Sequence, residues 1–177
     1  MESYRPGNAE GISPGPIQDI NPRISICIVT YRARDMLREC LNSIAKGTQS
    51  EYEVIVIDNN SSDGTRQMME ADFPAYRYFE NQINEGFTKP MNRALRAGKG
   101  YFLVLLNPDT LVLPRAFDLL ANFLEENPSA GVCGPKVMNP DRTLQKSCRR
   151  GESRPWAVIS YFSGFAKLFP KSKFWRK

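Results

Sequence analysis

The chain has 177 residues, 41% of them hydrophobic, and contains no histidine. A chain of this length buries enough apolar surface to fold as one globular domain, and the lack of histidine excludes Ser-His and Cys-His catalysis and every histidine-based zinc or iron site. The net charge of +5 is uneven, because residues 142–177 hold ten Lys and Arg against one acid. A mildly acidic part of the chain therefore precedes a basic tail.

Residues 1–22 are rich in glycine and proline and poor in large apolar side chains. Such a segment cannot bury enough surface to offset the entropy lost on ordering, so we expect a flexible leader. It lacks the basic start and apolar centre of a signal peptide, and no apolar run in the chain reaches the ~20 residues that span a bilayer. We therefore expect the protein on the cytoplasmic side of the membrane.

Hydrophobic periodicity predicts strands that alternate with helices. The strands are expected over residues 24–31, 53–58, 76–80, 101–106 and 131–134, and the helices from about 35 to 47, through 68–69, through 91–95 and from 114 to 127. The expected strand at 53–58 contains four consecutive β-branched residues, and the run at 101–106 is apolar throughout, which predicts strands buried on both faces. Turn residues at 139–142 predict a hairpin or a surface loop. The alternation indicates an α/β fold with a mostly parallel sheet and helices on both faces.

The four cysteines are scattered, with no CxxC pair. This spacing favours reduced thiols over a disulfide framework or a zinc site. Cys27, Cys40 and Cys133 fall on positions that are predicted to be buried.

Two of the predicted strands end in acidic turns, at Asp58 and at Asp109. The carboxyl ends of parallel strands share one edge of a sheet, so we expect both carboxylates there. The turn after the first strand has no glycine fingerprint, and the chain has no Gly-Lys-Ser/Thr phosphate loop. A bound diphosphate would therefore need a divalent cation, held by hard oxygen ligands such as Asp109. Asp58 has a structural alternative, since an aspartate after a strand often caps a turn.

Four motifs, in order along residues 24 to about 150, resemble the family-two glycosyltransferases of the GT-A fold. They are Ile28–Tyr31, Val56–Thr65, Asn84–Phe87 with Asn92, and Leu106–Thr110. Within that family the chain is similar to the rhamnosyltransferase-type members of bacterial polysaccharide biosynthesis. The resemblance implies a GT-A-like, Rossmann-like sheet and a domain at 23–150 that binds a nucleotide sugar.

The resemblance also implies which residues line the nucleotide-sugar site. They are Thr30, Tyr31, Asp58, Asn60, Asn84, Gly86, Asn92, Asn107 and Asp109. Thr30 and Tyr31 match positions that border the base, and Asp58 matches an acid that holds the base and ribose. Asn107 and Asp109 occupy the family's Asp-x-Asp motif, whose last carboxylate binds Mg²⁺ or Mn²⁺ between the two phosphates. Asn107 adds no charge, so weaker metal binding at Asp109 is expected.

The implied reaction is transfer of a sugar, with inversion, from a dTDP- or UDP-sugar donor to a glycan or lipid-linked acceptor in cell-envelope polysaccharide synthesis. Inversion needs a general base, which must be a carboxylate in a chain without histidine. Family members supply it well downstream of the metal motif, and here no acid follows Glu152. The catalytic base is therefore unknown, and we expect the chain to be the donor-binding part, with residues 151–177 beginning an incomplete acceptor half.

Two other functions remain open. One is a non-catalytic nucleotide-binding or scaffold module that acts through the basic tail. The other is a sugar-phosphate nucleotidyltransferase, which would want a glycine-rich, basic loop after the first strand, where only Arg32 and Arg34 are found.

Residues 156–177 combine aromatic side chains at helical spacing with a basic end. The apolar face is expected either to pack against the rest of the domain or to lie on an anionic membrane at its cytoplasmic face. No RNA- or DNA-binding motif accompanies it, so we expect no nucleic-acid partner.

Overall fold

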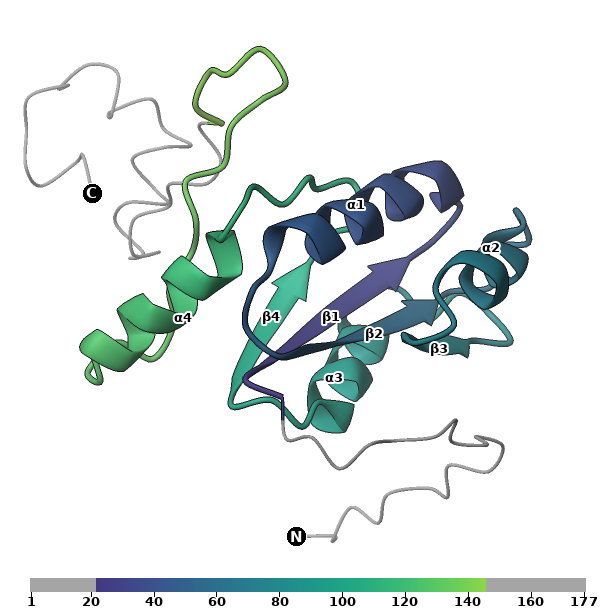
Figure 1. Cartoon of the computed structure of the whole chain (residues 1–177). Helices are drawn as coiled ribbons and strands as arrows, with labels where there is room; N and C mark the ends of the chain where they lie inside the picture. The colour runs from purple at the N-terminus through teal and green to yellow at the C-terminus, as the bar shows by residue number, and fades with distance from the viewer. Residues whose placement is uncertain (1–21, 146–177) are drawn as a thin grey trace, which may run out of the picture. The chain divides into compact units, whose positions relative to one another are not determined.

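The computed structural model describes residues 22–145 (Figure 1). The chain divides into two compact units between Pro128 and Ser129. In the second unit the described residues form one antiparallel bridge, between Met138 and Leu144, which confirms the expected hairpin or loop. The amphipathic segment 156–177 lies outside the described residues, as does the predicted leader apart from Pro22.

The first unit alternates strands and helices along the chain. The elements are β1 (Ile24–Thr30), α1 (Arg34–Gly47), β2 (Tyr52–Asp58), α2 (Thr65–Asp72), β3 (Arg77–Glu80), α3 (Thr88–Ala97), β4 (Phe102–Leu106) and α4 (Ala116–Glu126). The strands pair in the order β3-β2-β1-β4, and every pair is parallel. The predicted α/β fold is thereby confirmed, with β1 at the centre of the sheet.

Two apolar layers cover the sheet, one on each face (Figure 1). Side chains alternate along a strand, so Ile26 and Ile28 of β1 face α1, α2 and α4, whereas Cys27 and Val29 face α3. All seven residues of β1 are buried. Burial on both faces explains why Ile26–Val29 of β1 and Val54–Ile57 of β2 are uninterrupted apolar runs rather than alternating ones.

The prediction that the strand at 101–106 is buried on both faces was wrong. On the α3 side of β4, Leu103 is 46% exposed and Leu105 is 57% exposed. The reason is position, because β4 is the last strand of the described sheet and α3 packs mainly on β1 and β2. The strand predicted over 131–134 was also wrong, since those residues pair with no strand of the described part, and Cys133 is only half-buried.

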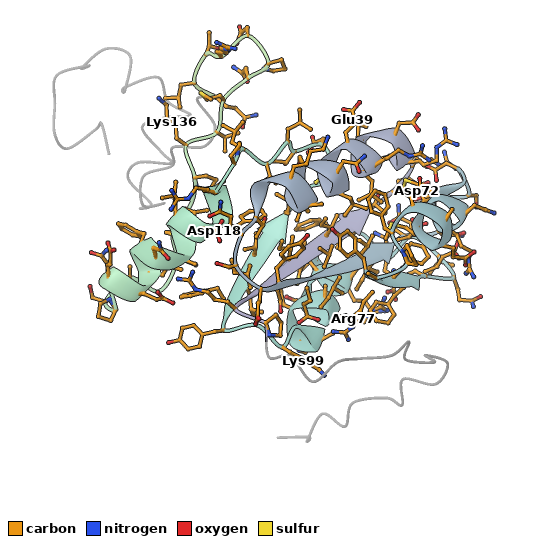
Figure 2. All side chains as sticks on the ribbon, in the orientation of Figure 1. Glu39, Asp72, Arg77, Lys99, Asp118 and Lys136 are labelled. Atoms are coloured by element: carbon orange, nitrogen blue, oxygen red, sulfur yellow. The ribbon has the colours of Figure 1, made fainter. Side chains whose placement is uncertain are left out.

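The amino edge of the sheet is closed by polar contacts. Glu53 accepts from the Ser25 hydroxyl at 2.7 Å, from Arg77 at 2.9 Å and from the Lys99 backbone N–H at 2.6 Å. Burial raises the pKa of Glu53, but these hydrogen bonds outweigh it and hold the pKa below its ordinary value. Figure 2 shows Arg77 and Lys99 together near the end of α3. Gly100 is required here, since a Cβ would lie 2.4 Å from the Ser25 nitrogen.

Candidate functional site

The carboxyl edge is where the polar turns gather. Thr30 pairs with Asp58 at the ends of β1 and β2, Asp58 pairs with Glu80 at the end of β3, and β4 ends level with Ile28. The four strands therefore deliver their following loops to the same edge, as the sequence predicted. In open α/β sheets this edge is where ligands bind.

Left-handed backbone is concentrated in the first two of these loops. Arg32 has φ 51°, Asn60 has φ 62° and Ser62 has φ 51°. The loops are held together by hydrogen bonds, such as that from the Arg32 N–H to the Ser61 hydroxyl at 2.8 Å. Strained non-glycine residues persist only where surrounding contacts fix them, and they cluster at functional sites.

Thr30 and Asp58 lie side by side below this edge but differ in their bonding. Both are 1% exposed. The Thr30 hydroxyl has no hydrogen-bond partner among the described residues. Asp58 is fully engaged, because one carboxylate oxygen accepts from the Ser61 N–H and hydroxyl and the other accepts from the Tyr78 hydroxyl at 2.9 Å. Burial raises the pKa of Asp58 despite these bonds.

Tyr31 and Asn60 lie higher in the same loops. Tyr31 is 43% exposed, with the Arg32 guanidinium 5.1 Å from its ring centre. Asn60 is exposed and donates to the Gln82 carbonyl at 2.9 Å. Both side chains are thus reachable from solvent at the carboxyl edge, whereas Asp58 is not.

The turn before α3 carries two of the predicted residues, Asn84 and Gly86, and α3 carries a third, Asn92. Asn84 accepts from the Gly86 N–H at 2.8 Å, and Gly86 has φ 74°, which favours glycine. Asn92 is exposed on α3 and, with Gly86 and Phe87, lines a hollow of about 490 Å³. The structure therefore brings Gly86 and Asn92 to one surface.

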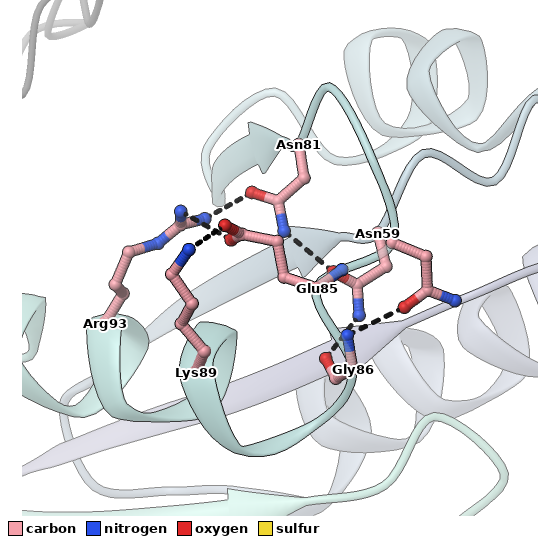
Figure 3. A network of polar contacts seen from close by, with 7 residues as sticks. Asn59, Asn81, Glu85, Gly86, Lys89 and Arg93 are labelled. Atoms are coloured by element: carbon pink, nitrogen blue, oxygen red, sulfur yellow. Dashed lines mark hydrogen bonds and ion pairs between the residues drawn. The ribbon is translucent and has the colours of Figure 1, made fainter.

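Three polar residues that the sequence analysis did not select support this turn (Figure 3). The Asn59 amide donates to the Gly86 carbonyl at 2.7 Å, the Asn81 amide donates to Asn59 at 2.7 Å, and Arg93 donates to Asn81. Asn59 and Asn81 each follow the last residue of a strand, β2 or β3. That position was the only sequence signal, and it did not reveal their partners.

The turn after β4 presents its side chains to solvent. Asn107 and Asp109 are exposed, and neither side chain hydrogen-bonds within the described part of the chain. The backbone is held by α1, since the Cys40 thiol donates to the Asn107 carbonyl at 3.8 Å and the Ser43 hydroxyl accepts from the Val112 N–H at 2.9 Å. A fixed backbone with free polar side chains suits ligand binding.

The oxygen donors at this turn fit a magnesium or manganese ion that is shared with a diphosphate. The described residues include no cluster of three metal-binding side chains. Such a cluster is not needed, because Mg²⁺ is commonly held by one or two carboxylates together with substrate phosphates and water. Asp109 would supply the carboxylate and Asn107 a neutral amide oxygen.

The structure defines an α/β protein with a parallel sheet, and open sheets of this class bind their ligands at the carboxyl edge. A family model, described as glycosyl transferase family 2, matches residues 25–174. The chain belongs to this family, which confirms the resemblance inferred from its motifs.

Relatives with known names agree with this assignment. The chain is 28% identical over 138 residues to the N-acetylglucosaminyl-diphospho-decaprenol L-rhamnosyltransferase of Mycobacterium tuberculosis, covering 72% of this chain and 45% of that protein. It is 27% identical to Staphylococcus aureus TarS 1-349 solved with UDP-GlcNAc, at a TM-score of 0.56, covering 66% of this chain and 38% of that one.

A third similarity is to a mannosyltransferase from Pyrobaculum calidifontis, solved with GDP-Man and Mn²⁺. Its sequence identity is 25% and its TM-score 0.52, covering 75% of this chain and 40% of that one. These structures confirm the GT-A-like fold. The chain spans less than half the length of the three proteins. No helix in residues 22–145 combines the length and apolar character needed to cross a membrane.

Proposed function

We propose that this chain binds a nucleoside-diphosphate sugar at its carboxyl edge, as the donor-binding part of an inverting glycosyltransferase of cell-envelope polysaccharide synthesis. The donor is a dTDP- or UDP-sugar, and the acceptor is a glycan or a lipid-linked sugar at the cytoplasmic face of the membrane. The observation that carries the proposal, in a chain of this family, is that the exposed side chains of Asn107 and Asp109 make no hydrogen bond within the described residues, at the same edge as loops of fixed backbone.

Each predicted residue receives a role in the proposed complex. Both Thr30 and Tyr31 lie beside the base. Thr30 offers a buried hydroxyl that has no hydrogen-bond partner in the described part, and Tyr31 offers an exposed ring. Asn60, Asn84 and Gly86 border the nucleotide from the loops after β2 and β3, and Asn92 borders it from α3. Asp58 is engaged by Ser61 and Tyr78, so its direct contact with base and ribose remains a prediction.

The proposed chemistry depends on charge at the leaving diphosphate. Breaking the bond from the sugar to the diphosphate leaves negative charge on the phosphate, and groups aimed at that charge stabilise the transition state most. A bound Mg²⁺ or Mn²⁺ would supply positive charge there. Asp109 would hold the ion, and Asn107 would offer a neutral oxygen or a donor to a ribose hydroxyl.

The acceptor hydroxyl must lose its proton to a base on the opposite side of the sugar. No residue of the described part is assigned to this step. We therefore expect the isolated 177-residue chain to bind the donor but to transfer sugar poorly. A turnover rate equal to that of a longer relative would contradict this expectation.

Calorimetry with UDP and dTDP, each with and without Mn²⁺, tests the proposal. We expect Asp109→Ala to weaken binding about tenfold or more with Mn²⁺, and to change it little without the metal. The matched control is Asp141→Ala, because Asn139-Pro140-Asp141 repeats the same three residues in a turn where Asp141 accepts from the Thr143 N–H at 2.9 Å. Equal, metal-independent affinity of the wild-type and Asp109→Ala chains would overturn the site.

A further inference from the structure

We infer that Asn59, Asn81 and Arg93, named here the positioning network, hold the turn at Glu85 and Gly86 in its binding conformation. Asn59 and Asn81 are buried positioning residues that act through the turn, and Arg93, which itself lines the hollow beside Gly86 and Asn92, orients them. The effect on nucleotide binding rests on the proposed function, whereas the hydrogen bonds of the network are those in Figure 3.

Arg93 determines which group donates and which accepts along the network. An arginine side chain only donates hydrogen bonds, so its bond to Asn81 fixes the Asn81 oxygen on that side. The Asn81 NH₂ group then faces Asn59 and donates to its oxygen at 2.7 Å. The Asn59 NH₂ group in turn faces the Gly86 carbonyl, also at 2.7 Å. Arg93 therefore determines the orientation of two amides and the donor presented to the turn.

The two amides lie in the interior, where their orientation matters. Asn59 is 2% exposed and Asn81 is 8% exposed. Their backbones are tied to the strand ends, since the Asn59 N–H donates to the Thr30 carbonyl at 2.9 Å and the Asn81 N–H donates to the Asp58 carbonyl at 2.8 Å. Leaving the oxygen or the NH₂ group of a buried amide unpaired costs free energy. Each hydrogen bond of the network is therefore needed to keep the two amides in this orientation.

Arg93 is itself fixed from a second side by Glu85. Arg93 donates to one Glu85 oxygen at 3.0 Å, and Lys89 donates to the other. The hydrogen bond from Lys89, with the charge of Arg93, holds the pKa of Glu85 below its ordinary value. The Glu85 N–H also donates to the Asn59 oxygen at 3.4 Å. The turn is therefore bound to both ends of the network.

A rigid turn lowers the cost of binding. Gly86 lines the same hollow as Asn92, and its left-handed backbone is one of several conformations open to a glycine. Fixing that conformation before the ligand arrives spares the ordering cost on association. Loss of the network should therefore weaken nucleotide binding while the core of the sheet stays folded.

Two variants of the whole 177-residue chain test whether losing the network has a larger effect than losing an ordinary surface ion pair. Arg93→Ala removes the donor that orients the amides and the pair with Glu85. Asn81→Asp keeps the shape and an acceptor for Arg93, but it cannot donate to Asn59. Arg38→Ala is the matched control, since Arg38 pairs with Asp72 at 3.2 Å and is 48% exposed, against 44% for Arg93.

Hydrogen exchange of the peptide over residues 84–87 and calorimetry with UDP and dTDP plus Mn²⁺ are the measurements. We expect exchange to be about fivefold faster and affinity about fivefold to tenfold weaker in Arg93→Ala and in Asn81→Asp. Arg38→Ala should match the wild type in both. Arg93→Lys, which restores the charge beside Glu85 but not a planar set of donors, should recover only part of the affinity.

The outcomes distinguish this inference from the proposed function. Unchanged exchange in both variants, with wild-type binding intact, overturns the network alone. Faster exchange with unchanged affinity shows that the turn is held but plays no part in binding, which also overturns the inference. A wild-type chain that binds neither nucleotide overturns the proposed function. Because Arg93 is on the surface, Arg93→Ala remains informative if Asn81→Asp fails to fold.

Discussion

Replacing Asp58 with Asn tests whether this buried acid supports the loop or contacts the nucleotide. Asp58 accepts from Ser61 and from Tyr78 and is 1% exposed. In Asp58→Asn the amide oxygen can keep the bonds from Ser61, and the NH₂ group can donate to the Tyr78 oxygen. The bonds become neutral rather than charge-assisted, while the cost of burying a charge disappears. Because burial outweighs these bonds in setting the pKa of Asp58, the two changes nearly offset each other, and we expect a loss of less than about 1 kcal/mol in the free energy of unfolding at neutral pH.

The pH dependence of that loss gives a second, signed test. Burial raises the pKa of Asp58 above its ordinary value of 3.8, so the folded protein binds this proton more tightly than the unfolded chain. The stability from this group is complete below that ordinary value and is lost as the pH rises through the raised value. Asparagine carries no such proton, so the penalty of Asp58→Asn should grow as the pH falls from about 7 to about 4.

Urea unfolding followed by circular dichroism, on both proteins at several pH values, measures this difference. The other carboxylates largely cancel between the two proteins. A penalty that shrinks as the pH falls would refute the reasoning, since it would require a lowered pKa. Calorimetry on the same variant addresses function, and we expect nucleotide affinity to change less than about threefold. A loss of about tenfold in a folded variant would instead support direct contact with the ligand.

Three further predictions concern the scaffold around the site. Gly100→Ala places a Cβ 2.4 Å from the Ser25 nitrogen and should cost about 1–3 kcal/mol or more in thermal or urea unfolding. Leu105→Ala should cost less than about 1 kcal/mol, because Leu105 is 57% exposed, whereas Leu41→Ala, in the buried core, should cost about 2–5 kcal/mol by the same assay. Burial raises the pKa of the Cys40 thiol to about 12, so a thiol reagent should modify Cys40 only after unfolding.

The order of elements and the site edge could be predicted from the sequence, because periodicity and turn composition are local properties. The apolar run of β2 indicated a strand buried on both faces, and the acidic turns after β2 and β4 indicated the carboxyl edge. The motif order also indicated the family that the family model then matched. None of these inferences required knowledge of which residues meet in space.

The tertiary structure decided what depends on neighbours far along the chain. Leu103 is exposed because β4 ends the described sheet, although its sequence resembles that of a central strand. Asp58 and Asp109 look alike in sequence, yet one is buried and engaged by Tyr78 while the other is exposed. The partners of Arg93 lie on other loops, so no local pattern could reveal them.

The loop after β4 offers side-chain oxygen atoms that the described part of the protein leaves without hydrogen bonds, and the proposed function depends on them. The sequence determined that a carboxylate would stand at this end of the sheet. Only the packing of α1 beneath the loop, and the burial of Asp58 in hydrogen bonds with Ser61 and Tyr78, decided that Asp109 is the carboxylate available to a ligand.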